Sequence, residues 1–334
     1  MPIIRKPSIT GDSIKQAVLS SEEKRPPLVE GLIHDNQSIM ISSDTGAGKS
    51  TIIACMMAQA SSGFPVFSQL FCPRPLVIYY IPFERGIQEI TERFKHLEEA
   101  IPINYNNIYL NENFTGMNVI NDKHADDIIL NISKDLDSRK VDIIIIDPIY
   151  ASVAGGLSTD EKASQFTRFS TRIMAEFKCS NLLIHHTSRD VYSVQGKRID
   201  KDDPFYGSIW LKAHCNGGFY MKRTQETEGV TLFNKKDSQS VLLSKIPLKY
   251  CADSGSVFIN GLDLSMPAKD RLLMAYRTFY RMKKIVTFAQ IKGCVEGVSD
   301  GHLRALLRTP PFDKCFNKSI RNGESTLYTP TMDI

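Results

Sequence analysis

A short segment of this chain, residues 43–51 (SDTGAGKST), combines residue types that can hold a phosphate group. Gly46 and Gly48 allow the backbone to curl so that successive N–H groups face an anion. Lys49 can reach the β- and γ-phosphates of a nucleotide, and the Ser50 hydroxyl is a suitable ligand for Mg²⁺. The candidate nucleotide-binding residues of this segment are Asp44, Thr45, Gly46, Ala47, Gly48, Lys49, Ser50 and Thr51.

The sequence on either side has the elements that position such a loop. Residues 38–42 are an apolar run that predicts a buried strand, and residues 49–60 predict a helix whose N-terminus adds its positive end to the anion site. The full pattern begins with glycine, whereas this chain has Ser43, which we expect to be tolerated because that glycine mainly eases the turn out of the strand. The alternative, a chance Gly-Lys-Ser in an ordinary loop, does not explain the matching flanks.

Two carboxylates follow predicted strands. Residues 75–81 (PLVIYYI) predict a buried strand that leads to Glu84, and residues 87–100 have helical periodicity. A carboxylate at the tip of a strand beside the nucleotide strand can orient an attacking water. Equally, Glu84 can be an acid that complements the dipole of the following helix. These residues alone leave both interpretations open.

The second carboxylate ends a run of four isoleucines. Residues 141–148 (VDIIIIDP) predict a central parallel strand that is covered on both faces. Asp147 then lies at the carboxyl end of the strand, where ligands bind in open α/β sheets, and it can hold a water of the Mg²⁺ shell. A phosphate-binding loop together with an aspartate-ended strand predicts nucleotide binding.

A third predicted strand, residues 181–184, ends in His185 and His186. A histidine beside the γ-phosphate position could sense hydrolysis and pass the change to the loop behind it. A histidine at this place can also be an ordinary core or loop residue.

The composition is that of a globular protein. The 334 residues are 42% hydrophobic and 23% charged, which predicts one large and one small domain or two domains. No apolar run of about 18 residues predicts a membrane span, and the N-terminus has no apolar core followed by a cleavage site, so we expect a cytoplasmic protein. The seven cysteines are scattered without a Cys-x-x-Cys pair, which predicts reduced, mostly buried thiols rather than zinc ligands or disulfides.

Strands and helices alternate over residues 26–264, which predicts an α/β fold with a mostly parallel sheet and helices on both faces. Residues 1–25 are polar and predict an N-terminal arm. Within the α/β part, residues 151–164 predict a mobile loop before a helix over residues 165–179. Residues 190–203 predict a long charged loop that carries Lys197 and Arg198. Further on, residues 218–223 and 229–234 predict paired strands, with Lys235 and Lys236 directly after them.

The C-terminal part is basic. Residues 266–334 hold 12 Lys and Arg against 6 Asp and Glu, whereas the rest of the chain holds 29 against 31. Such an excess is typical of a segment with an anionic partner, although a solvated charged face has the same composition.

The pattern of residues 266–334 predicts a small winged-helix-like domain. It has two helices, a third helix over residues 301–308 for which Val298-Ser299-Asp300 offers an N-cap, and strand-like pieces around Asn322-Gly323 that predict a hairpin. In that layout the third helix and the hairpin can contact DNA phosphates, but many winged helices bind proteins instead. The candidate DNA-binding residues here are Arg304, Arg308, Lys318 and Arg321.

In this order of motifs the chain resembles a RecA-like P-loop ATPase, specifically the RepA-type hexameric replicative helicase group. The matching segments, in chain order, are PPLVEGLI, SDTGAGKST, YYIPFERGIQEITERF, IIIIDPIY, LLIHHTSR and the region from GSIWLKAHCNGGFYMKR to LFNKKD. The ordered set is specific to RecA-like ATPases and less specific to helicases among them.

The resemblance implies a role for each matched residue. Lys49 and Ser50 would bind phosphate and Mg²⁺, Asp147 would support the metal, and Glu84 would activate water. Additional residues implied at the site are Arg93, nine residues after Glu84, for the nucleotide, and His186 as the γ-phosphate sensor. The loops after Asp147 and after His186 would face single-stranded DNA in the channel of a ring. The cation donated by the neighbouring subunit would be Lys235 or Lys236, with Arg223 as a further candidate.

The resulting hypothesis is an Mg²⁺-dependent ATPase that forms a ring, most simply a hexamer, and moves on or unwinds single-stranded DNA. A site completed by a neighbouring subunit requires a homo-oligomer. One alternative is an ATP-dependent DNA-binding switch or recombination mediator without unwinding activity. Another is an ATPase that regulates protein partners only. Replication proteins are possible further partners of the helicase.

Overall fold

The computed structural model describes much of the chain. The described residues are 26–44, 46–84, 86–98, 101, 103–157, 159–186, 209–224, 229–251 and 256–259, and, toward the C-terminus, 268–269, 272–273, 276, 280, 286–288, 291–292, 295, 298–310, 312–319 and 326–331. Several predictions concern residues outside these ranges. They are the arm over residues 1–25, the loop over residues 190–203 with Lys197 and Arg198, Thr45, Arg321 and the Asn322-Gly323 turn.

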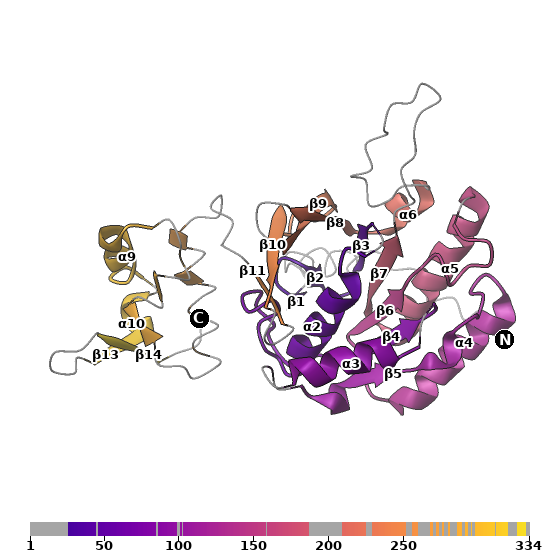
Figure 1. Cartoon of the computed structure of the whole chain (residues 1–334), viewed down its shortest axis with the longest axis horizontal. Helices are drawn as coiled ribbons and strands as arrows, with labels where there is room; N and C mark the ends of the chain where they lie inside the picture. The colour runs from indigo at the N-terminus through magenta and orange to yellow at the C-terminus, as the bar shows by residue number, and fades with distance from the viewer. Residues whose placement is uncertain are drawn as a thin grey trace, which may run out of the picture.

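The described part of the core is built on a nine-stranded sheet (Figure 1) in the order β11-β10-β9-β8-β3-β7-β6-β4-β5. The strands are β3 (Ser38–Ser43), β4 (Ile78–Pro82), β5 (Ile108–Leu110), β6 (Ile143–Asp147), β7 (Ser180–His186), β8 (Gly217–Thr224), β9 (Gly229–Asp237), β10 (Lys245–Tyr250) and β11 (Val257–Ile259). All neighbours from β8 to β5 pair in parallel, and β9, β10 and β11 continue the sheet by antiparallel pairing. The strand that precedes the glycine-rich segment, β3, therefore lies inside the sheet between β7 and β8.

Helices cover both faces of this sheet. Successive residues of its central strands accordingly pack in two different hydrophobic cores. On β6, Ile143 and Ile145 pack in one core, and Ile144 and Ile146 pack in the other. The first core contains α2 (Lys49–Ser61) and α3 (Gln88–Leu97), and the second contains α4 (Asp122–Leu136), α5 (Asp160–Phe177) and α6 (Ile209–His214). The predicted fold class, a mostly parallel α/β sheet with helices on both faces, is confirmed.

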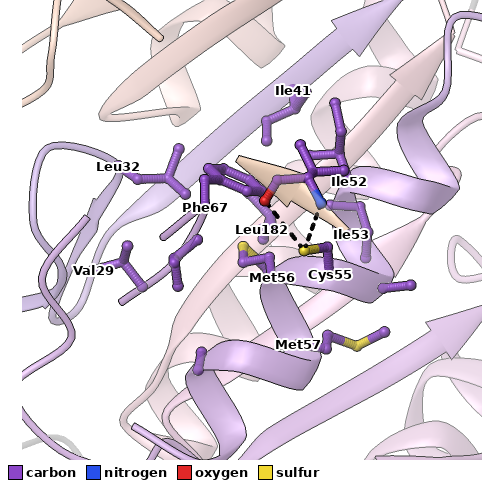
Figure 2. Close-up of a cluster of buried hydrophobic side chains, with 14 of the residues drawn as sticks. Val29, Leu32, Ile41, Ile52, Ile53, Cys55, Met56, Met57, Phe67 and Leu182 are labelled. Carbon is purple, nitrogen blue, oxygen red and sulfur yellow. Dashed lines mark hydrogen bonds between the residues drawn. The ribbon is translucent and has the colours of Figure 1, made fainter. Parts of the chain in front are cut away.

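Helix α2 is buried along nearly its whole length, and Figure 2 shows its side chains Ile52, Ile53, Cys55, Met56 and Met57 in a buried hydrophobic cluster. Cys55 of α2 contacts Val257 of β11 twice: the Val257 N–H donates to Cys55 Sγ at 3.3 Å, and Cys55 Sγ donates to Val257 O at 3.6 Å. Burial raises the pKa of the Cys55 thiol to about 12. Among the described residues six cysteines are thiols, and five of them are buried, as the sequence predicted.

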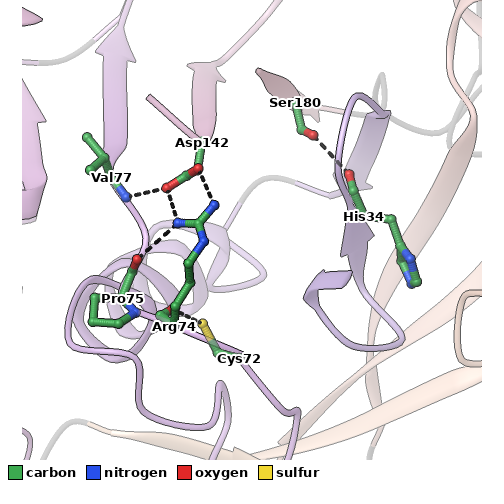
Figure 3. Close-up of polar contacts among 7 residues, drawn as sticks. All are labelled: His34, Cys72, Arg74, Pro75, Val77, Asp142 and Ser180. Atoms are coloured by element: carbon green, nitrogen blue, oxygen red, sulfur yellow. Dashed lines mark hydrogen bonds and ion pairs between the residues drawn. The ribbon is translucent and has the colours of Figure 1, made fainter. Parts of the chain in front are cut away.

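The buried carboxylate of Asp142 joins the strand that leads to Glu84 and the strand that ends in Asp147 (Figure 3). Arg74, in the segment before β4, donates from Nη1 to Asp142 Oδ2 at 2.8 Å and from Nη2 to Oδ1 at 2.7 Å. The Val77 N–H donates to the same Oδ2 at 2.9 Å. Asp142 directly precedes β6, so these bonds fix the N-terminal ends of β4 and β6 relative to each other.

Three predictions about these elements were wrong. Glu84 follows β4, which is not beside β3, because β7 and β6 lie between them. Residues 160–164 are not part of a loop but begin α5, because Thr159 Oγ1 accepts from the Lys162 N–H at 3.4 Å and caps the helix. Strand β9 extends to Asp237, so Lys235 and Lys236 lie within the strand rather than after it.

The described C-terminal residues form a small α+β unit with its own core. A three-stranded sheet has the order β12-β14-β13, from β12 (Val286–Thr287), β14 (Leu327–Pro330) and β13 (Phe316–Ser319). The helices α9 (Asp300–Leu306) and α10 (Phe312–Cys315) pack with it, and Ser299 Oγ accepts from the His302 N–H, as the predicted cap requires. The winged-helix assignment and the division into domains stay predictions.

Two short strands, β1 (Pro27–Val29) and β2 (Ile33–His34), precede β3 in the sequence and form a separate antiparallel pair. Among the residues that the structure describes, no helix has both the length and the apolar character needed to cross a bilayer.

Candidate nucleotide site

The glycine-rich segment is a tight loop between β3 and α2. Gly46 and Gly48 have positive φ angles of 76° and 98°, which side-chain-bearing residues rarely adopt. Gly48 is the N-cap of α2 and provides no side-chain cap for the helix. The positive end of α2 is therefore available to an anion, and the predicted strand, loop and helix are confirmed.

Lys49 is buried, with only 6% of its surface exposed. Its Nζ donates to Ser43 Oγ at 2.6 Å, to Ser43 O at 3.1 Å and to Asp44 O at 3.2 Å. Burial lowers the Lys49 pKa to about 8, and the charges of Asp147, Asp44 and Glu84 oppose that shift. The ammonium thus lies over the loop within the field of three carboxylates. Ser43, predicted only as a tolerated replacement for glycine, holds this ammonium.

Asp147 lies at the carboxyl end of β6, in register with Pro82 of β4. It is buried, and Tyr80 Oη donates to its Oδ2 at 2.7 Å. Burial raises the Asp147 pKa to about 6, although the Tyr80 hydrogen bond and the Lys49 charge lower it. At neutral pH the carboxylate is mostly ionised in a poorly solvated place, which is the chemistry of a ligand for a hard cation or its bound water.

Glu84 follows the end of β4 and is exposed. Although β4 is not adjacent to β3, the carboxyl ends of parallel strands meet at one edge of a sheet, and the Glu84 charge acts on Lys49. Tyr150 Oη donates to Glu84 Oε2 at 2.5 Å. The Tyr150 ring packs edge-on against His186, with ring centroids 5.4 Å apart. Glu84 and His186 are therefore joined through one tyrosine.

The two histidines at the end of β7 lie beside the start of the phosphate loop. In the parallel register between β3 and β7, His185 pairs with Ser42 and His186 pairs with Ser43. The structure thus brings His186 to the strand end that carries the loop, where the sequence predicted a sensor. Its role in sensing a phosphate stays a prediction.

Arg93 contacts Thr51, the last residue of the predicted phosphate-binding segment. From α3, its Nη1 donates to Thr51 Oγ1 at 2.5 Å, and its Nη2 pairs with Glu89 Oε1 at 2.7 Å. Arg93 therefore lies next to the first turn of α2, near the predicted nucleotide-binding residues Ser50 and Thr51.

The three cations proposed as intersubunit residues lie in different places. Arg223, near the end of β8, donates from Nη2 to Gly46 O of its own chain at 2.9 Å. Lys236 pairs in register with Gly218, near the opposite end of β8. Its Nζ contacts Lys212 O of α6. Lys235 and Lys236 are consequently remote from the phosphate loop of the same chain.

The described C-terminal cations pack on aromatic rings. Arg304 of α9 lies over the Phe288 ring, 4.2 Å from its centroid, and Lys318 of β13 lies 5.9 Å from the centroid of Tyr328. The Phe288 and Tyr328 rings are themselves 6.5 Å apart. Arg304 therefore packs on one ring of this aromatic pair and Lys318 on the other. Arg308 is exposed and lies two residues after the end of α9.

The residues of the loop fit a nucleoside triphosphate with its metal. A helix N-terminus without a side-chain cap and a buried ammonium suit phosphate oxygens, and Ser50 with Asp147 supplies the oxygen ligands that Mg²⁺ prefers. Among the described residues there is no group of three or more His, Cys, Asp or Glu that could hold a metal by themselves.

Tyrosines are the residues of the site that sequence reasoning missed. Tyr80 and Tyr150 contact the two carboxylates, and Tyr250 of β10 donates from Oη to Ala47 O at 3.4 Å. Each contact joins residues more than 60 positions apart, so neither spacing nor periodicity could reveal it. Tyr150 carried one weak signal, because it follows Asp147 closely in the chain.

The sequence profile of the AAA domain family matches residues 7–191, which is more than half of the chain. Among solved structures, the chain is similar to the KaiC-like protein PH0186 from the hyperthermophilic archaeon Pyrococcus horikoshii OT3. That match has 11% sequence identity and a TM-score of 0.45, and covers 70% of this chain and 94% of the other. No curated protein sequence matches the chain.

Proposed function

Because the chain belongs to the AAA domain family, we propose that it is an Mg²⁺-dependent ATPase whose motor acts on single-stranded DNA, as a ring-forming replicative helicase of RepA type. The observation that supports hydrolysis is the convergence of three groups at one sheet edge: the buried Lys49 ammonium at the phosphate loop, the buried Asp147 carboxylate and the exposed Glu84 carboxylate. The order of motifs supports the helicase assignment.

In the proposed reaction, the loop amides and Lys49 hold the β- and γ-phosphates of ATP. Ser50, and Asp147 through a water molecule, would hold Mg²⁺, which would supply positive charge to offset the charge that develops during phosphoryl transfer. Glu84 orients the attacking water and accepts its proton. Tyr80 keeps the Asp147 carboxylate in place, and Tyr150 does so for Glu84. His186, which touches Tyr150, passes the loss of the γ-phosphate to the loop that follows β7.

A cation from the neighbouring subunit completes each site in this proposal, with Lys235 or Lys236 in that role. Their distance from the phosphate loop of their own chain is consistent with a function in a second subunit. Such a site requires a homo-oligomer, most simply a hexameric ring.

DNA contact is proposed for two groups of cations. Lys197 and Arg198 belong to the loop after His186, outside the described residues. In the C-terminal unit the candidates are Arg304, Arg308, Lys318 and Arg321. Arg304 and Lys318 are favoured within this set because their aromatic partners limit the freedom of both side chains, so less entropy is lost when a phosphate binds.

The ATPase proposal is tested by replacing Lys49 with alanine. Lys49→Ala is expected to lower steady-state ATP turnover by a factor on the order of 100 or more, because the charge at the β- and γ-phosphates is lost. Lys95→Ala is the matched control, since Lys95 is an exposed lysine of α3. Full turnover by Lys49→Ala would exclude this site as the centre of hydrolysis.

The helicase proposal is tested by strand displacement from a forked DNA substrate, together with the mass of the protein in solution with an ATP analogue and single-stranded DNA. Unwinding by a hexamer is the expected result. ATP turnover that single strands stimulate without displacement would instead identify a DNA-binding switch. Turnover that no nucleic acid alters would point to an ATPase that acts on protein partners.

A further inference from the structure

We propose that Tyr250 and Arg223 position the phosphate loop of their own chain and thereby set its affinity for nucleotide. This inference rests on the proposed nucleotide site but assigns a role to residues outside the loop segment. Both side chains come from strands that follow the loop in the sequence, β8 and β10. Both donate hydrogen bonds to backbone carbonyls of the loop.

Arg223 reaches the loop because β8 pairs in parallel with β3. Ser43, the last residue of β3, is in register with Met221, so Arg223 lies two residues further along, at the level where the loop begins. From there its Nη2 donates to Gly46 O at 2.9 Å. The guanidinium is exposed, so its other N–H groups are accessible to solvent.

Tyr250 contacts the next peptide of the loop. It is the last residue of β10, is half-buried, and donates from Oη to Ala47 O at 3.4 Å. Its Oη lies 2.1 Å from the place that a Cβ on Gly48 would occupy. Burial raises the Tyr250 pKa, so the phenol remains a donor at neutral pH. The close approach requires glycine at this position, independently of the phosphate.

These carbonyl contacts orient an amide because the trans peptide group is planar. The C=O and the following N–H point in opposite directions, so holding Ala47 O also directs the Gly48 N–H away from Tyr250. The Ala47 N–H is already engaged, since it donates to Asp44 O at 3.3 Å. Gly48 is therefore the amide whose direction Tyr250 sets.

Restraint matters here because the loop contains two glycines with positive φ. Such a segment samples many conformations, and fixing it upon binding reduces affinity. Side chains that hold Gly46 O and Ala47 O before nucleotide arrives lower that cost. The same geometry gives Arg223 a function within its own subunit, which differs from the intersubunit role that sequence resemblance also allowed.

The first test measures nucleotide affinity. For the full-length protein, the dissociation constant of a fluorescent ADP analogue is expected to rise by about 5-fold in Tyr250→Phe and about 10-fold in Arg223→Ala, as loss of one hydrogen bond implies. The KM for ATP should rise in the same order as the dissociation constants, with a smaller change in kcat. Arg223→Lys should recover part of the affinity. The controls are Lys222→Ala and Lys249→Ala, which alter neighbouring residues of β8 and β10. Unchanged dissociation constants in both Tyr250→Phe and Arg223→Ala would overturn the proposal.

The second test mixes Arg223→Ala with Lys49→Ala. If Arg223 serves its own loop, each subunit of the mixture remains defective at its own site, and turnover at subsaturating ATP does not exceed the sum of the separate variants. Turnover well above that sum would show that Arg223 acts on a neighbouring subunit and would overturn the proposal. Failure of the wild type to hydrolyse ATP would refute the proposed function alone, because the affinity test needs only binding.

Discussion

Replacing Asp147 with asparagine is expected to stabilise the protein in the absence of nucleotide while removing its activity. In the folded protein, burial raises the Asp147 pKa from 3.8 to about 6. A carboxyl group with a raised folded-state pKa contributes stability below its unfolded pKa and loses that contribution as the pH rises through the folded pKa. The ionised form at pH 7.5 is therefore unfavourable for folding.

The size of the effect follows from the shift. About two pKa units at about 1.4 kcal/mol each give an upper value of about 3 kcal/mol at pH 7.5. Asparagine has no charge to desolvate, and its Oδ1 can still accept from Tyr80. Lys49 loses a compensating charge in the variant, which offsets part of the gain. We expect Asp147→Asn to raise the free energy of unfolding by about 1–3 kcal/mol at pH 7.5 and by almost nothing at pH 4.

Urea unfolding at several pH values between 4 and 7.5, without nucleotide or metal, measures this difference. Asp142→Asn is the matched control, because Asp142 is also buried but is held by Arg74 and the Val77 N–H. Its loss is expected to destabilise the protein at pH 7.5. A gain for Asp147→Asn that does not depend on pH, or a loss at pH 7.5, would refute the assignment of Asp147 as a carboxylate made unfavourable by burial.

Two further substitutions test the tyrosine contact to Glu84 and the arginine contact that joins β4 to β6. Tyr150→Phe removes the donor to Glu84 and should reduce kcat by about 3- to 10-fold while nucleotide affinity is unchanged; a fall in affinity with unchanged kcat would contradict this. Arg74→Ala leaves the buried Asp142 with fewer donors and should lower the free energy of unfolding by about 1–2 kcal/mol, since Arg74 itself is half-exposed. Unaltered urea midpoints would show that the Val77 N–H alone suffices.

Much of the fold and the centre of the site could be predicted from local sequence. The loop between β3 and α2 was predictable because its glycines, lysine and flanking apolar residues are contiguous. Asp147 was predictable because four isoleucines precede it, as expected for a strand buried on both faces.

Features that depend on distant residues could not be predicted in this way. Strand order is not encoded in the periodicity of one strand, so the separation of β4 from β3 was missed. The end of β9 was missed because its second half is polar and partly exposed, although pairing continues through an irregularity at Gly218 and Phe219. The tyrosine contacts to the loop and to the acids depend on that same three-dimensional order.

The contact between Cys55 and Val257 joins strand β11 to helix α2, the helix that begins at the phosphate loop. Helix α2 begins at the phosphate loop and is surrounded by close-packed side chains, so a shift of its axis cannot be absorbed by empty space. Strand β11 is hydrogen-bonded to Cys55, so we expect a shift of α2 to move β11 as well. Residues 260–267 alone separate β11 from the first described residues of the basic C-terminal unit. We therefore expect a change at the base of α2 to reach β11, the last strand of the nine-stranded sheet in chain order.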